Sequence, residues 1–210
     1  MRTKPQLSDL HPWLRHRVDE LAELHNSVYP ERALCLIWAH RTVDEQRAAH
    51  RAGRSRLDGV RRFSLHNLLP SLAADLWVYT EEEGAEDAAL FEDRPPRGAG
   101  LSLQLLQRGS LKTYYYPMAR LSQEAGLEAG AFWRRLKDGP HVQVPEPNRN
   151  MLVQAALNKS GASLAVDGDV GPRTMGAIGD AAQRLGVTTK RSALLPISPA
   201  LWGALHKEGA

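Results

Sequence analysis

The chain has 210 residues, of which 42% are hydrophobic and 24% are charged; this composition excludes a disordered chain and permits one medium domain and one small one. The net charge of +3 favours anionic partners. The arginine-rich stretch at 47–62 lacks the interleaved aromatic residues of a single-strand-binding surface, so we expect no nucleic-acid partner. The single cysteine, Cys35, excludes an intramolecular disulfide.

The N-terminal sequence MRTKPQLSDLHPWLRH contains no uninterrupted apolar stretch of the signal-peptide kind. No segment approaches the ~18 apolar residues that are needed to cross a bilayer. We therefore expect a protein that is made in the cytoplasm and stays there at first, without stable membrane insertion.

The N-terminal third of the chain predicts a helix, a strand and a second helix. Ser8 is the expected N-cap of an amphipathic helix, whose apolar residues recur at spacings of three and four. The short apolar run LCLIWA at 34–39 predicts a buried strand. Thr42 and Glu45 form a capping-box pattern, from which a helix should run to Gly53.

Two later segments, 73–79 and 141–144, alternate with the period of a strand. Each places apolar residues on one face and a possible metal ligand, Asp75 or His141, on the other. Between them, residues 80–100 predict a long surface loop, whose acidic cluster is an alternative cation site. A helix is expected from Pro117 to Gly126.

A change of composition at Pro145-Glu146-Pro147-Asn148 predicts a linker at 146–150. Beyond it, helices are expected at 151–158 and at 172–185, where Gly186 ends the second one, and the tail past Thr189 should supply a last helix. We therefore predict a domain at 1–145 and a small three-helix domain at 151–210.

Two of the eight histidines lie in patterns that indicate a metal site. His66 precedes Asp75 on a predicted strand, and Asp138 precedes His141 by three residues. The other histidines that we considered are expected to be structural or surface residues: His11, His16, His25, His50 and His206.

Two histidines and one carboxylate leave an open fourth position on a tetrahedral zinc ion, as catalytic zinc sites require. His66, Asp75 and His141 are the expected ligands of such an ion, which would activate a water molecule. Asp138 is the candidate catalytic base, because the Gly139-Pro140 turn can bring its carboxylate beside that water without making it a ligand. Spacing alone does not identify the site, since His-x8-Asp is no universal zinc motif.

Arg41 and Gln46 lie at a strand-to-helix junction, where side chains often line a cleft. A guanidinium there could bind a substrate carboxylate or stabilise a developing oxyanion. The alternative is an arginine at a helix start that points into solvent.

Three segments resemble one family of zinc peptidases: RTVDEQRAAHRAGRS (41–55), SLHNLLPSLAAD (64–75) and FWRRLKDGPHVQ (132–143). That family includes D-alanyl-D-alanine carboxypeptidases of the vancomycin-resistance type and phage L-alanyl-D-glutamate endolysins. The resemblance implies an α+β domain in which a small antiparallel sheet with flanking helices carries the site. It also implies roles: His66, Asp75 and His141 as Zn2+ ligands, Asp138 as catalytic base, and Arg41 as a catalytic and substrate-binding residue. Ser64 matches the family's serine two positions before the first ligand, and we expect Ser64 and, from its place at the strand-to-helix junction, Gln46 to contact the substrate as well.

The endolysin branch is favoured because aspartate, rather than glutamate, precedes His141 by three residues. The segment 114–133 also resembles that branch. There are departures, since the family more often has seven than nine positions from the first histidine to the aspartate. Ala129 and Val142 stand where aromatic residues are common, which concerns the shape of the substrate pocket.

The C-terminal segment resembles the peptidoglycan-binding module of bacterial and phage wall hydrolases, a three-helix bundle. The resemblance rests on LNKSG (157–161) and VDGDVGPRT (166–174), followed by Ala177 and Ile178. Asp167 or Asp169 can cap backbone amides in the turn. The alternative is a calcium loop, but the remaining ligands of an EF-hand are missing.

Together these features predict a peptidoglycan hydrolase, an endolysin that cuts the L-alanyl-D-glutamate bond of the stem peptide and so causes bacterial cell-wall lysis. We expect an antimicrobial bacteriophage enzyme that acts as a monomer on peptidoglycan and waits in the host cytoplasm until its release. The alternatives are a D-alanyl-D-alanine carboxypeptidase and a wall-binding protein without catalysis.

Overall fold

The computed structural model describes residues 5–80, 90–91, 111–134, 137–189 and 194–208. The chain forms two compact units, each assembled from two stretches of sequence. The first unit comprises Met1–His40 and Ala73–Val144, and the second comprises Arg41–Leu72 and Pro145–Ala210. The predicted division into domains at 1–145 and 151–210 stays a prediction.

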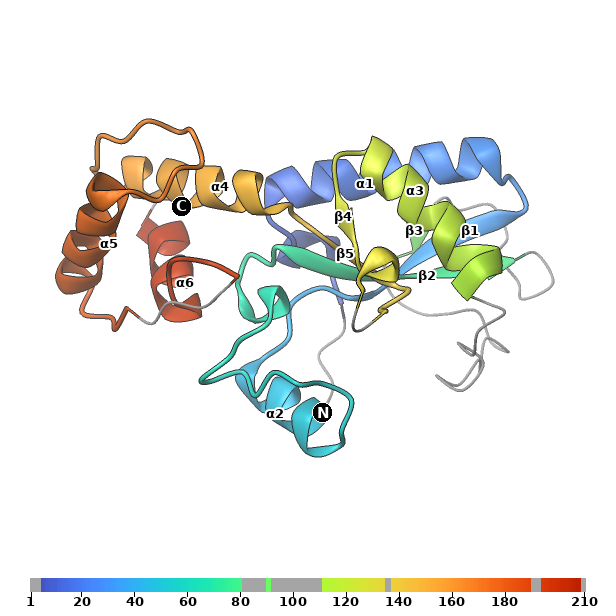
Figure 1. Ribbon diagram of the computed structural model, residues 1–210, viewed down its shortest axis with the longest axis horizontal. Coiled ribbons are helices and arrows are strands. Elements are labelled where there is room, and N and C mark those ends of the chain that lie inside the picture. The colour runs from blue at the N-terminus through green and yellow to red at the C-terminus, as the bar shows by residue number, and fades with distance from the viewer. Residues whose placement is uncertain (1–4, 81–89, 92–110, 135–136, 190–193, 209–210) are drawn as a thin grey trace. The chain divides into compact units, whose positions relative to one another are not determined.

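A five-stranded sheet with the order β3-β1-β2-β5-β4 forms the centre of the first unit (Figure 1). Neighbouring strands are antiparallel, except that β3 runs parallel to β1. The strands are β1 (Arg32–Trp38), β2 (Ala73–Thr80), β3 (Leu90–Phe91), β4 (Glu128–Ala129) and β5 (His141–Gln143). The three predicted strands and the α+β class are confirmed; β3, which is parallel to β1, and β4, which is antiparallel to β5, were not predicted. Apart from β3, the predicted loop at 80–100 lies almost wholly outside the described residues.

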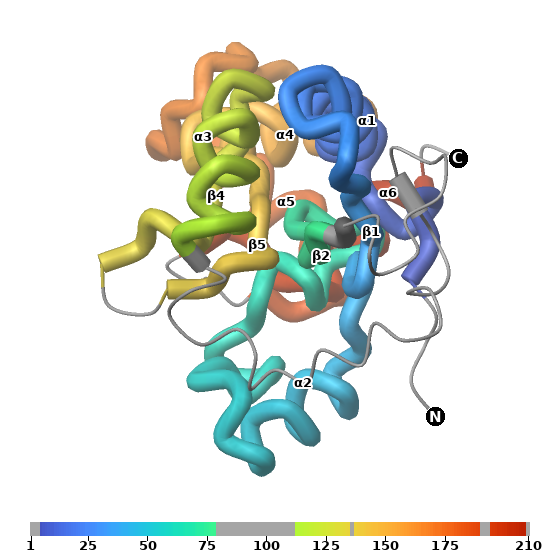
Figure 2. Tube along the Cα trace, turned by 90° about the vertical axis from the view of Figure 1, so that its right-hand side faces the viewer, coloured from blue at the N-terminus to red at the C-terminus, as the bar shows by residue number. Residues whose placement is uncertain are grey.

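Two helices, α1 (Pro12–Val28) and α3 (Tyr116–Glu124), lie side by side over one face of this sheet (Figures 1 and 2). The expected N-cap of the first helix was wrong. Ser8 lies in a short 3-10 turn, Leu7–Asp9, and His11 caps α1 by accepting a hydrogen bond from the Trp13 amide. Proline at the first helical position explains the later start, because Pro12 has no N–H to satisfy and its φ is already helical.

The core of the first unit lies between this pair of helices and the apolar face of the sheet. The register of β1 and β2 pairs Leu34 with Val78 and Leu36 with Leu76, so these four side chains share one face. Of the apolar residues of α1 that were expected to face the core, Leu14, Val18 and Leu21 are fully buried, whereas Leu24 is only partly buried. Burial of this stripe is the main source of stability for a helix of this kind.

His25, on α1, predicts a pH dependence of stability. Its side chain is fully buried, and neither ring nitrogen has a hydrogen-bond partner among the described residues. Burial, aided by the positive charge of Arg32, lowers the pKa of His25 to about 4. Because the unfolded chain binds the proton more readily, this contribution to stability is complete above pH ~6.5 and is lost as the pH falls towards 4, by about 3 kcal/mol in all.

We therefore expect His25→Phe to flatten the fall in melting temperature between pH 6.5 and pH 4. The control is His16→Gln, because His16 lies on the exposed side of the same helix and pairs with Glu20. Equal pH dependence in parent and His25→Phe proteins would show that His25 is not the group responsible.

The second unit begins with α2 (Val43–Arg51), whose capping box is formed as predicted. Thr42 accepts a hydrogen bond from the Glu45 amide, and the Glu45 carboxylate accepts one from the Thr42 amide. The chain turns after the helix at Gly53, which has a φ of +69°. A 3-10 turn, η2 (Leu65–Asn67), follows.

The C-terminal part of this unit contains the three predicted helices, α4 (Glu146–Lys159), α5 (Pro172–Arg184) and α6 (Pro199–Glu208). The structure corrects one boundary, because residues 146–150, which we predicted as a linker, are the first part of α4. Pro145 precedes the helix and Pro147 lies in its first turn, where proline removes no helical hydrogen bond. The proline pair is therefore a helix start.

Gln154, which is almost fully buried, organises the loop between α4 and α5. Its side-chain oxygen accepts hydrogen bonds from the amides of Asp167 and Gly168, and its nitrogen donates to the Asp167 carboxylate at 2.8 Å. Asp167 also caps the Asp169 amide, as one of the two expected caps. This part of the loop is thus held by hydrogen bonds of the chain itself.

Among the helices that the structure describes, none combines the length and the apolar composition that crossing a bilayer demands.

Candidate metal centre

The pairing of β2 with β5 places two of the predicted ligands opposite each other. Asp75 and His141 are direct partners in the antiparallel register, so their side chains project from the same face. The Asp75 Oδ1 atom lies 3.0 Å from His141 Nδ1. Both side chains are largely buried, with 15% and 8% of their surfaces exposed, so the pair is shielded from bulk water.

The third predicted ligand, His66, lies in η2, which is fixed by its own capping box. The Ser64 hydroxyl accepts a hydrogen bond from the His66 amide, and the Asn67 side chain accepts one from the Ser64 amide. The amide of Arg41 donates to the His66 carbonyl at 2.7 Å, and Asn67 donates to the Arg41 carbonyl at 2.8 Å. The backbones of Arg41 and His66 are therefore tied together.

The loop between His66 and Asp75 is longer than the resemblance implied, and it folds back on its own start. Both the Ser71 hydroxyl and the Leu72 amide lie 3.4 Å from the Leu65 carbonyl, to which they donate. These hydrogen bonds hold the end of the longer loop against its start.

The side chains of His66, Asp75 and His141 come together as one group of possible metal ligands. One ligand atom from each residue lies within 4.8 Å of the other two, and both histidines are buried. Two imidazoles and a carboxylate are the donor set that zinc accepts while keeping a position open. The geometry is therefore compatible with a bound divalent cation.

The electrostatics around His141 favour a positive charge. Burial opposes the charged imidazolium, but the hydrogen bond and the negative charge of Asp75, with a further contribution from Asp138, raise the pKa of His141 above its ordinary value. The same negative field would stabilise a divalent cation held between these residues.

Two neighbours of His141 were not identified from the sequence. Gln143, which is 4% exposed, places its Oε1 atom 3.0 Å from His141 Nε2. The ring of Trp133 lies 5.0 Å from the imidazole, between ring centres, and its Nε1–H donates to Glu128. The period-two alternation places Gln143 on the face of His141, but only the fold reveals the contact with the ring.

The predicted base, Asp138, lies on the turn before β5 and is held there by the backbone. Its amide donates to the Gly130 carbonyl at 3.1 Å, and its carbonyl accepts a hydrogen bond from the His141 amide at 3.4 Å. A Cβ atom at Gly130 would stand 2.7 Å from the Asp138 carbonyl oxygen and 3.0 Å from the His141 Cβ atom. Glycine at 130 therefore permits the close approach of the two segments.

Arg41 is half-buried and donates from Nη1 to the Gln46 Oε1 atom at 3.1 Å, which disfavours an arginine that merely points into solvent. Gln46 is fully buried, and its amide nitrogen donates to the Ser55 hydroxyl and the Leu57 carbonyl. These contacts tie the side chains of Arg41 and Gln46 to each other, and the substrate contacts expected of both residues stay predictions.

Ser64 is likewise buried, and its hydroxyl is engaged in the capping of η2. Its observed contacts orient the segment of His66. Ala129 and Val142 stand where the family often has aromatic residues. They are buried and pair with each other between β4 and β5. Val142 alternates with His141, so it faces away from the candidate metal centre.

Comparisons with known proteins find a likeness in structure but no match in sequence. No protein-family model and no curated protein sequence matches this chain. A crystal structure of the Serratia marcescens L-Ala D-Glu endopeptidase ChiX is similar over 68% of this chain and 85% of that one, with 21% identity and a TM-score of 0.41. A likeness at this level does not assign a fold or an activity to this chain.

Proposed function

We propose that this chain is a zinc-dependent peptidoglycan peptidase. The observation that supports the proposal most strongly is the group formed by His66, Asp75 and His141, whose ligand atoms lie within 4.8 Å of one another. Asp138, a second carboxylate, acts electrostatically on His141. A ligand set with an open position, together with a second carboxylate near enough to act on one of the ligands, suits hydrolysis rather than a purely structural metal site.

The donor set fits zinc in chemistry, and the spacing of one pair of donor atoms also fits. Two donor atoms on one tetrahedral zinc ion, each at about 2.1 Å, lie roughly 3.4 Å apart. The distance of 3.0 Å between Asp75 Oδ1 and His141 Nδ1 is close to that value. Zinc, when bound, supplies Lewis acidity for the hydrolysis of an amide bond.

The residues of the chain then have distinct tasks. Asp138 takes the proton of the attacking water and returns it to the departing amine. Arg41 binds a carboxylate of the substrate or stabilises the developing oxyanion, because its guanidinium offers paired donors. Gln46 and Ser64 act through others, since Gln46 positions Arg41 and Ser64 orients the segment that carries His66.

The finer assignment rests on the sequence motifs. The Asp138-to-His141 spacing resembles the endolysin branch, so we propose the L-alanyl-D-glutamate bond of the stem peptide as the bond that is cut, with the D-alanyl-D-alanine bond as the alternative. We propose that the three C-terminal helices, α4 to α6, form a wall-binding module. We also propose that the protein is a monomeric phage lysin, which is released from the host cytoplasm to peptidoglycan.

The proposal is tested by metal analysis together with the clearing of purified sacculi. We expect about one zinc per chain, and a fall in turbidity that a chelator stops and added zinc restores. Iron in place of zinc would contradict the metal assignment, because a two-histidine, one-carboxylate set also serves Fe(II) enzymes. Clearing at an undiminished rate by the metal-free protein would contradict the mechanism.

Gln143 gives a prediction about metal affinity. Its Oε1 atom accepts a hydrogen bond from His141 Nε2, which leaves the lone pair on Nδ1, the nitrogen that faces Asp75. Loss of such an outer hydrogen bond usually lowers metal affinity by about 10–100-fold. We expect this loss for Gln143→Leu, measured by competition with a chromophoric chelator.

Gln143→Glu is the matched control, because a carboxylate oxygen still accepts the hydrogen bond from Nε2. It should bind zinc with an affinity near that of the parent protein, and 15N NMR of His141 should show the proton on Nε2 in both. If Gln143→Leu bound zinc as tightly as the parent protein, the hydrogen bond between Gln143 and His141 would not contribute to metal binding.

A further inference from the structure

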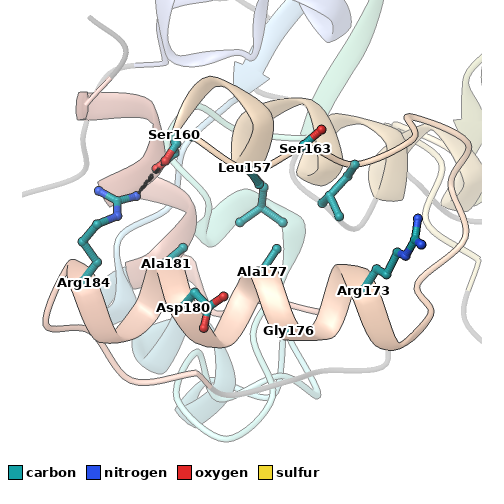
Figure 3. Close-up of a pocket in the computed structure, with 12 residues that line it drawn as sticks. Leu157, Ser160, Ser163, Arg173, Gly176, Ala177, Asp180, Ala181 and Arg184 are labelled. Carbon is teal, nitrogen blue, oxygen red and sulfur yellow. Dashed lines mark hydrogen bonds between the residues drawn. The ribbon is translucent and has the colours of Figure 1, made fainter.

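A pocket of about 490 Å3 lies in the C-terminal part of the second unit, between α5 and the end of α4 with the loop that follows it (Figure 3). Its volume falls within the range of about 300–1,000 Å3 that is common for ligand pockets. Leu157 on α4 and the small side chains of Ala177 and Ala181 on α5 point toward one another across its floor. The metal centre uses none of these residues.

One end of the pocket is closed by an arginine whose charge is already paired. Arg184 donates from Nη2 to the Ser160 carbonyl at 3.0 Å and also contacts the Ser160 hydroxyl and the Glu208 carboxylate (Figure 3). The contact with Arg184 lowers the pKa of Glu208. Arg184 therefore belongs to the wall of the pocket and offers little charge to a ligand.

Two other charged residues of the lining remain available. Arg173 and Asp180 are exposed, and in the described part of the chain their side chains form no hydrogen bond or ion pair. They are seven residues apart on α5, which places them on one face of the helix at a separation of about 10 Å along its axis. Among the described residues that line the pocket, none has an aromatic side chain on which a sugar ring could stack.

Gly176 leaves open space above α5 at the point where the helix lines the pocket. Glycine in a helix interior is destabilising relative to alanine. A Cβ atom at Gly176 would have no other atom within 4 Å, so packing within the described chain does not require glycine here. Gly176 lines the pocket, and a methyl group there would occupy space that is otherwise open.

We propose that this pocket binds a short peptide that carries both a free carboxylate and a free ammonium group, the carboxylate at Arg173 and the ammonium at Asp180. Three extended residues span at most about 11 Å, which matches the separation of the two charges. Resting on the proposed function, we assign this peptide to the stem of peptidoglycan rather than to its glycan strand.

The test is an NMR titration of the full, zinc-loaded chain with γ-D-glutamyl-meso-diaminopimelate. This probe has free carboxylates and amines and contains neither of the two bonds that the metal centre could cut. We expect shifts of the Ala177 and Asp180 amide signals with the peptide, and none with chitotetraose. Shifts caused by the sugar but not by the peptide would overturn the proposal.

Two glycine variants of α5 separate binding from stability. Gly176→Ala and Gly179→Ala both lie in the helix interior with open space around the new methyl group, but only Gly176 lines the pocket. Both should raise the melting temperature by a few degrees, of order 2–4 °C. Only Gly176→Ala should weaken peptide binding, by about tenfold or more; equal binding by the two variants would overturn the proposal.

Asp180→Asn should weaken binding as well, because it removes the charge that faces the ammonium group. The clearing of sacculi is followed separately. Zinc-dependent clearing by a protein whose α5 signals do not respond to the peptide overturns this inference alone, whereas binding at α5 without any hydrolysis overturns the proposed function alone.

Discussion

Replacing His66 with alanine is expected to abolish stoichiometric zinc binding and to lower the rate of sacculus hydrolysis by about 10³-fold or more, since a catalytic metal contributes several kcal/mol to the stabilisation of the transition state. His66 is one of three residues whose ligand atoms lie within 4.8 Å of one another, and two ligands hold a metal far less firmly than three. Zinc content after dialysis and the initial rate of clearing measure the two effects.

Two further variants make this result interpretable. His16→Ala removes an exposed histidine of α1 and should leave zinc content and activity unchanged. His66→Gln keeps much of the buried volume, so a folded protein without zinc would separate loss of the metal from loss of the fold. If folded His66→Gln retained one zinc per chain and the parent rate, His66 would not be a ligand.

Asp138→Asn is expected to keep zinc and to lose hydrolysis. Asparagine has nearly the shape of aspartate but cannot accept the proton of the attacking water, so the rate should fall by about 10²–10⁴-fold. The backbone contacts that hold this residue, to Gly130 and His141, do not involve the carboxylate. Asp138→Asn should therefore lower the rate of clearing without lowering the zinc content, whereas His66→Ala should lower both.

The matched control is Asp44→Asn, because Asp44 is a carboxylate with 93% of its side chain exposed. It should behave as the parent protein in both measurements. Parent activity in Asp138→Asn would show that another group serves as the base, and loss of zinc in the same variant would make Asp138 a ligand.

Local sequence patterns were sufficient for three of the five strands, β1, β2 and β5, and for several helix ends, but not for the short strands β3 and β4. The period-two alternation around Asp75 and His141 predicted that each strand carries one ligand opposite its apolar face, and the register of β2 with β5 pairs them. The capping box at Thr42 was also identified from sequence, because both of its partners lie within one turn. Such features depend on neighbours in the chain.

What escaped prediction depends on contacts between distant residues or on competing local signals. At the start of α1 a good cap, Ser8, was displaced by the proline at position 12. The proline pair at 145 and 147 has the composition of a linker, yet it begins α4. In both places proline in the first turn agrees with the observed start, but it competed with another local signal.

The surroundings of the candidate metal centre could not be derived from the motifs. Gln46 is fully buried and accepts a hydrogen bond from Arg41, neither of which its place at a strand-to-helix junction predicted. Gln143 and Gly130 have no motif of their own; their roles follow from the orientation of the His141 ring and from the approach of two backbone segments.

Mass spectrometry of the fragments that the zinc-loaded protein releases from purified sacculi tests the central claim most directly. The proposed activity predicts new amino termini on D-glutamate, at a rate that a chelator abolishes. Release of free D-alanine alone would assign the chain to carboxypeptidases instead. The absence of any new amino terminus or free D-alanine with one zinc bound per chain would contradict a peptidase of either kind.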